Sequence, residues 1–103
     1  MITKIYKGTD FAIRLNIMDC GGRRILPQNC MEYTCMLWTT DYDNCLVKTP
    51  NEEGDVYIQR DEYANFIEGV LKYEVRIIFK SDYYTGQKQL VKFGETNLYI
   101  NKK

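Results

Sequence analysis

The sequence predicts an all-β fold: an antiparallel, immunoglobulin-like β-sandwich of about seven strands with one short helical turn, formed by a single domain over residues 1–103. Three observations predict it. Apolar and polar residues alternate through much of the chain. Turn residues interrupt this alternation at intervals of roughly 8–15 residues. Nine tyrosines and four phenylalanines favour strands over helices. A small barrel of about five or six strands is the alternative architecture.

The clearest strand covers residues 69–80. Its odd positions from Leu71 to Phe79 are all apolar, whereas its even positions are polar apart from Ile78. A period of two is typical of a strand with one face on a core and the other in water. We therefore expect Val75 to point into the core and Lys72 to point into solvent, and the other strands to cover the apolar face.

Two strands are expected at the start of the chain, over residues 2–7 and over residues 11–18, where apolar residues occupy every second position. Gly21 and Gly22 predict a turn after them, because glycine reaches the positive φ that other residues resist. Residues 25–29 read as an extended link, and Pro27 excludes this link from a central strand.

The strand expected over residues 31–40 has two apolar faces. Met31, Tyr33, Cys35 and Leu37 form one face, and Thr34, Met36 and Trp38 form the other. Such a strand is either covered on both sides or exposes one side as a contact surface. Trp38 as a core or edge-covering residue is the favoured interpretation. The alternative is a subunit interface, for which the candidate residues are Thr34, Met36 and Trp38. Cys35 and Trp38 share this strand, so "immunoglobulin-like" describes the architecture only.

The second half of the chain alternates short strands and turns. Strands are expected over residues 45–49, stopped by Pro50, and over residues 56–59. Asp61 is a competent N-cap, and the apolar residues after it are spaced three or four apart, which predicts one or two helical turns ended by Gly69.

The last strand is expected over residues 87–101. The parity of its apolar residues slips near Gly94. A glycine at such a slip predicts a bulge.

Charge and hydropathy exclude several partners. Fourteen basic and fourteen acidic residues cancel, so no net field draws the chain to nucleic acid or to an anionic membrane. No apolar run approaches the roughly 20 residues that span a bilayer. The first residues lack the pattern of a signal peptide, so we expect cytoplasmic synthesis.

No catalytic constellation is found. The chain has no histidine, which removes the commonest general base and metal ligand. Carboxylate pairs occur at Glu52-Glu53 and at Asp61-Glu62, where we expect ordinary solvation. The loop at residues 41–44 lacks the pattern of an EF-hand. The turn at residues 21–24 lacks the frame of a phosphate-binding loop. We therefore expect no enzyme activity, no catalytic residues, no metal and no cofactor.

The four cysteines allow three interpretations. They are Cys20, Cys30, Cys35 and Cys45, an even number that is compatible with disulfides. Reduced thiols are the default for a chain without a signal peptide. A zinc site is the third interpretation, although zinc sites usually contain closely spaced cysteine pairs and the gaps here are ten, five and ten residues.

A hairpin loop is expected over residues 81–86, and its Tyr83 and Tyr84 are exposed in that reading. Aromatic rings in a loop stack on sugars or contact protein partners. Tyr42, Tyr83 and Tyr84 are therefore the candidate ligand or partner residues.

The turn and strand residues follow one another in an order that resembles the sequence pattern of a known family. In the first half the order is Ile5-Tyr6-Lys7-Gly8-x-Asp10-Phe11, then Asp19-x-Gly21-Gly22, then Leu26-Pro27 before a tyrosine-bearing strand. In the second half it is Gly54-Asp55-Val56, a short acidic turn at Asp61, and Gly69-x-x-x-Tyr73-x-Val75. This order spans nearly the whole chain and resembles the N-terminal domain family of phage baseplate upper proteins. Trp38 and the four cysteines lie outside the pattern.

The resemblance implies a non-enzymatic structural module of a phage or prophage virion, located in a tail, a baseplate or a fibre attachment. Members of such a family assemble into homo-oligomers, often trimers, and contact other virion proteins. The alternative function is a small β-sandwich binding module for a carbohydrate or a protein ligand, with Trp38 and the candidate tyrosines as a stacking platform.

Overall fold

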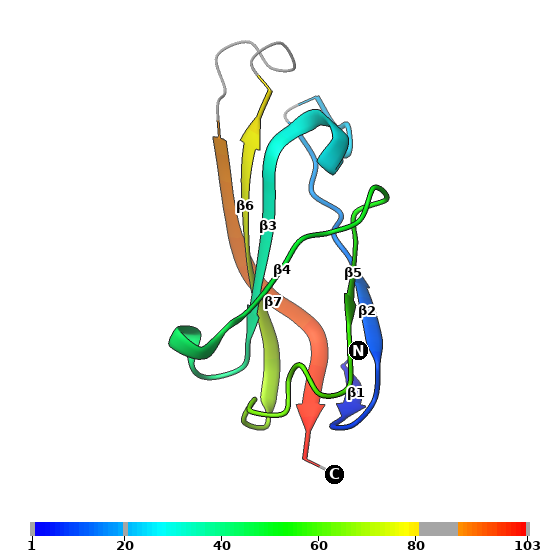
Figure 1. Cartoon of the computed structure of the whole chain (residues 1–103), viewed down its shortest axis with the longest axis vertical. Helices are drawn as coiled ribbons and strands as arrows, with labels where there is room; N and C mark the ends of the chain where they lie inside the picture. The colour runs from blue at the N-terminus through cyan, green and yellow to red at the C-terminus, as the bar shows by residue number, and fades with distance from the viewer. Residues whose placement is uncertain (1, 20, 81–88, 103) are drawn as a thin grey trace.

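The computed structural model describes residues 2–19, 21–80 and 89–102. These residues form seven strands in two sheets. The larger sheet has the order β1-β7-β6-β3-β4, with strands β1 (Thr3–Tyr6), β3 (Cys30–Trp38), β4 (Leu46–Lys48), β6 (Gly69–Phe79) and β7 (Gln89–Asn101). The smaller sheet pairs β2 (Phe11–Arg14) with β5 (Asp55–Ile58). Figure 1 shows β2 and β5 beside the larger sheet as a second layer. The all-β prediction is confirmed.

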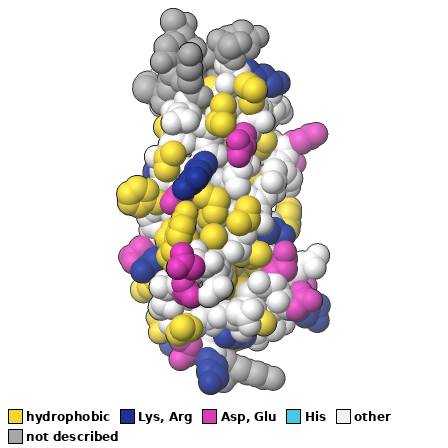
Figure 2. All heavy atoms as spheres, turned by 60° about the vertical axis from the view of Figure 1, so that its left-hand side comes forward, with side chains coloured by type: hydrophobic (Ala, Val, Ile, Leu, Met, Phe, Trp, Pro, Cys, Tyr) yellow, Lys and Arg dark blue, Asp and Glu magenta, His cyan; other side chains and the backbone are white. Residues whose placement is uncertain are grey.

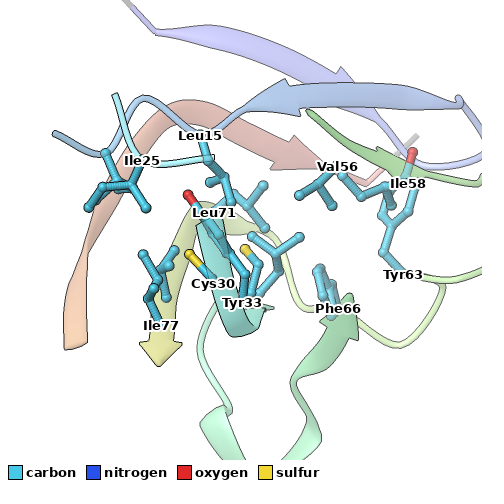
Figure 3. Close-up of a cluster of buried hydrophobic side chains, with 14 of the residues drawn as sticks. Leu15, Ile25, Cys30, Tyr33, Val56, Ile58, Tyr63, Phe66, Leu71 and Ile77 are labelled. Atoms are coloured by element: carbon cyan, nitrogen blue, oxygen red, sulfur yellow. The ribbon is translucent and has the colours of Figure 1, made fainter. Parts of the chain in front are cut away.

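The core lies between the two sheets. Strand β6 occupies the centre of the larger sheet, and its inward residues Leu71, Val75 and Ile77 are completely or almost completely buried. Val56 and Ile58 enter the same cluster from β5. Figure 3 shows side chains from both sheets pointing into this cluster. The alternation in the sequence therefore predicted the facing of β6, because burial of alternate apolar residues fixes which side of a strand meets the core.

One strand pair departs from the antiparallel prediction. Strand β1 pairs with β7 in parallel, with Thr3 opposite Leu98 and Ile5 opposite Ile100. The reason is the short connection between β1 and β2, which passes from the larger sheet to the smaller one. This change of sheet prevents a β1–β2 hairpin, and β1 instead lies along the edge of the last strand of the chain.

The predicted helical turn after Asp61 is wrong. The described residues contain no α-helix, and residues 59–66 form successive turns with hydrogen bonds from Glu62 N to Gln59 O and from Phe66 N to Tyr63 O, each 3.0 Å long. The two 3-10 helices found among the described residues lie elsewhere, at η1 (Pro27–Asn29) and η2 (Tyr42–Asn44). The buried pair Tyr63 and Phe66 is spaced by three residues, which turns of this kind satisfy as well as a helix does.

Tyr63 fixes the connection between the two sheets. Its side chain is fully buried and its ring packs edge-on against Phe11 with centroids 5.3 Å apart. Its hydroxyl donates toward the carbonyl oxygens of Thr9 (2.6 Å) and Tyr6 (3.1 Å) and accepts a hydrogen bond from Thr9 N (3.1 Å). These contacts hold the backbone where the chain leaves β1 and enters β2.

The irregularity in β7 lies just after the glycine where a bulge was expected. Val70 pairs with Tyr99 and Lys72 pairs with Glu95, so residues 96–98 lie opposite a single residue of β6. Thr96 fills this bulge, because its hydroxyl donates to Leu71 O (2.8 Å) and accepts from Leu98 N (3.0 Å).

Three carboxylates join segments that are distant in sequence. Asp55 accepts two hydrogen bonds from Arg14, which lower the pKa of Asp55. The backbone N–H and side chain of Arg60 lower the pKa of Asp10, and hydrogen bonds from Gln59 N and Lys48 lower the pKa of Glu62. These three carboxylates therefore bind protons less tightly in the folded state than in the unfolded state. The stabilising contribution is complete above the ordinary carboxyl pKa of about 4 and is lost as the pH falls through the lowered values.

We therefore expect the free energy of unfolding to fall between about pH 5 and about pH 2. Urea denaturation at a series of pH values measures this change. Asp55→Asn should reduce the slope of stability against pH, because one of the contributing carboxylates is then absent. A denaturation midpoint that stays constant over this range would contradict the assignment.

Candidate protein interface

The outer face of the larger sheet is the side that points away from the core. Strand register places Arg76 beside Val91 and Glu74 beside Phe93 on this face. Several large apolar side chains are exposed here: Phe93 (73%), Val47 (60%), Val91 (53%) and Ile78 (36%). Figure 2 turns this side of the molecule forward and shows hydrophobic side chains interspersed with basic and acidic ones.

A groove of about 380 Å³ runs along β6 and β7 on the outer face. Phe93 lies at one end, level with Glu74, and Gln89 lies at the other end, level with Ile78. Val91 lies between them along β7, and Glu32 of β3, opposite Ile78, also lines the groove. The groove is partly open to solvent, so a side chain that projects from another molecule could enter it.

The charges in the groove are largely compensated within the chain. Arg76 Nε donates to Glu74 Oε2 at 2.6 Å, and this hydrogen bond raises the pKa of Arg76. The hydroxyl of Tyr42 also donates to Glu74 Oε2, at 3.3 Å. Because the guanidinium is already paired with a carboxylate, the described residues that line the groove include no unpaired cation for an anionic ligand.

The three residues predicted as an interface do lie together on the outer face of β3, but they are unequally accessible. Met36 is only 7% exposed, so its own chain already covers it. Thr34 and Trp38 are half-buried. Trp38 packs edge-to-face with Tyr42, with ring centroids 4.8 Å apart and planes at 84°. Tyr42 therefore belongs to the same surface, whereas Tyr83 and Tyr84 lie outside the described residues.

The most exposed apolar residues of this face are not among the interface residues that the sequence predicts. Val47, Ile78, Val91 and Phe93 fit the pattern of ordinary strand residues. The sequence does contain a signal for this exposed face. Leu90, Val91 and Phe93 are apolar residues that lie on both sides of one strand. Ile78 also interrupts the polar positions of β6. A strand that is apolar on both faces, next to a strand with one apolar residue on its polar face, indicates an exposed apolar patch.

The described residues contain no cluster of acidic and cysteine side chains that could hold a metal ion. Cys30, Cys35 and Cys45 are free thiols. Burial raises the pKa of Cys35 to about 12 and also raises that of Cys30, so both thiols stay protonated and weakly nucleophilic.

The loops that were weighed as ion sites are satisfied internally. Asp19 accepts hydrogen bonds from the N–H groups of Gly21 and Arg23, each at 2.8 Å, in the glycine turn. Asp41 accepts from Asp43 N at 3.1 Å and thereby caps η2. These contacts account for both loops as ordinary turns.

Comparison with known proteins adds no relative: no protein-family model matches the chain, and neither a curated protein nor a solved structure matches it. Within the part of the chain that the structure describes, no helix is long and apolar enough to cross a membrane. The outer face is therefore the feature on which a functional proposal depends.

Proposed function

We propose that this protein is a non-enzymatic assembly module that acts through protein–protein contacts on the outer face of its larger sheet. The observation that carries the proposal is the exposure of Val47, Ile78, Val91 and Phe93 on one face. Monomeric proteins rarely expose contiguous apolar patches of more than a few hundred Å², so several exposed apolar side chains on one face favour an interaction site. Interfaces are also enriched in phenylalanine and arginine, and their centres are poor in unpaired charge, as in the groove beside Arg76.

The setting that we propose is a phage or prophage virion, with the module in a tail, a baseplate or a fibre attachment and in contact with other virion proteins. The resemblance of the glycine and strand motifs to the N-terminal domain family of phage baseplate upper proteins supports this setting. The same proposal includes that the two sheets pack as an immunoglobulin-like sandwich.

A carbohydrate-binding platform is less well supported than a protein interface. Such a platform needs aromatic rings with open faces. In the Trp38–Tyr42 pair the edge of one ring meets the face of the other, and the Tyr42 hydroxyl is bonded to Glu74. This arrangement favours a surface that is packed for contact with a protein.

Photo-cross-linking tests the proposed function. A chain with benzoylphenylalanine in place of Phe93, produced in its native host and irradiated, should give a discrete covalent product. Mass spectrometry should identify the partner as a virion structural protein or as a second copy of the chain. The matched control carries the same group in place of Tyr57, which is 60% exposed on the smaller sheet. No product at position 93, or equal products at both positions, would refute the interface. A partner unrelated to virions would refute the phage setting.

A further inference from the structure

The outer face carries a projecting side chain and a groove that can receive one. Phe93 is 73% exposed at one end of the groove, and Ile78 and Val91 are among the apolar residues that line it together with Glu32, Glu74, Arg76 and Gln89. A volume of about 380 Å³ falls within the range of roughly 300–1,000 Å³ that holds small organic molecules, so it can accommodate a phenyl ring. A face with both features is complementary to itself. Self-complementarity is the requirement of a two-fold interface, in which each partner contributes the same patch.

The charges of the face also suit a second copy. Arg76 is paired with Glu74, and Lys72 lies opposite Glu95 in the strand register, while Glu32 adds one further carboxylate to the lining of the groove. The whole chain has no net charge. Because charges of both signs alternate on this face and the chain has no net charge, two copies can approach with little mutual repulsion, whereas a strongly acidic or basic partner would find only a weak complementary field.

The size of the face allows a specific but weak dimer. Strands β3, β6 and β7 lie about 4.8 Å apart, and the eleven residues of β6 extend about 36 Å, which gives a face of roughly 500 Å². A face-to-face pair would bury roughly 1,000 Å² in total, which is near the lower limit for a specific interface. We expect dissociation in the micromolar range or above.

We propose that a second copy of this chain covers the outer face in a two-fold dimer, in which each Phe93 ring enters the groove of the other copy beside Ile78 and Val91. This inference depends on the proposed function of the outer face and names its partner. It differs from the interface expected from the sequence, because the contact is centred on β6 and β7 rather than on Met36 and Trp38.

Sedimentation equilibrium of the purified chain from about 10 μM to about 1 mM tests the proposal. The mass should rise from monomer to dimer over this range. Phe93→Ser should weaken dimerisation about tenfold or more, because two rings per dimer lose their burial. Tyr57→Ser removes a ring of the smaller sheet that is also largely exposed, at 60%, and should leave the dissociation constant unchanged. Circular dichroism verifies that both variants are folded.

The contact itself is tested by isotope-filtered NMR on a mixture of labelled and unlabelled chains. Intermolecular NOEs are expected between the Phe93 ring and the Ile78 methyl groups. A chain that stays monomeric throughout, an equal effect of Tyr57→Ser, or intermolecular NOEs confined to other surfaces would overturn the dimer. If the chain is monomeric but benzoylphenylalanine at position 93 captures a virion protein, self-association fails and the proposed function stands. If neither is observed, both fail.

Discussion

Val75→Asp is expected to leave no folded protein. Val75 is fully buried on the inward side of β6, with Cys35 and Lys92 as its neighbours in the adjacent strands. An aspartate here places a carboxylate in an apolar cluster and removes a packed isopropyl group. Burial of a carboxylate costs several kcal/mol even with the solvent-exposed Lys92 opposite, and the total stability of a domain this size is about 5–10 kcal/mol. Far-UV circular dichroism and the dispersion of amide NMR signals measure the loss of structure.

Lys72→Asp is the matched control on the same strand. Lys72 points to the outer face, beside Trp38 and Glu95 in the register. Its replacement exchanges one charged group for another and places a like charge opposite Glu95, so the free energy of unfolding should change by less than about 1 kcal/mol. Similar losses in both variants would show that the two faces of β6 are wrongly assigned.

The facing of β6 could be predicted from the sequence because its alternation is nearly perfect and one side must be buried. The facing of β7 could not be predicted in the same way. Leu90, Val91 and Phe93 make the strand apolar on both sides, so its pattern does not say which side meets the core. The pairing with β6 decides which side of β7 meets the core, because Leu90 lies opposite the inward residue Ile77. The parallel pairing of β1 likewise depends on a contact between the two ends of the chain, which local patterns do not encode.

Only part of the candidate interface could be predicted from the sequence, because alternation gives the direction of a side chain and not its exposure. Alternation correctly placed Thr34, Met36 and Trp38 on one side of β3. Exposure depends in addition on what lies above each residue, and Met36 is covered although it points outward. Tyr42, which joins the surface by packing against Trp38, comes from a different element. A period of two therefore gives the direction of a side chain but not its accessibility.

The core contains two buried tyrosines in opposite situations. The Tyr63 hydroxyl donates toward two carbonyl oxygens and accepts from a backbone N–H group at the crossing between the sheets. The Tyr33 hydroxyl is buried, and within residues 2–19, 21–80 and 89–102 it has no hydrogen-bond partner. Burial raises the pKa of Tyr33, so the hydroxyl remains protonated. Removal of the two hydroxyls should therefore have effects of different sign.

Tyr63→Phe is expected to lower the free energy of unfolding by about 2–3 kcal/mol, because the carbonyl groups of Tyr6 and Thr9 and the N–H of Thr9 lose a buried partner. Tyr33→Phe should leave stability unchanged or raise it by up to about 1 kcal/mol, because an unpaired polar group leaves an apolar site.

Urea denaturation of the two variants and the parent chain, followed by circular dichroism, measures both effects under the same conditions. Each substitution removes one oxygen atom and keeps the ring, so differences in packing volume are small and the hydrogen bonds dominate the comparison. Equal destabilisation by the two substitutions would mean that Tyr33 also has a partner. No effect of Tyr63→Phe would mean that the crossing between β1 and β2 is held by side-chain packing, such as that of Phe11 on the Tyr63 ring, rather than by the hydroxyl.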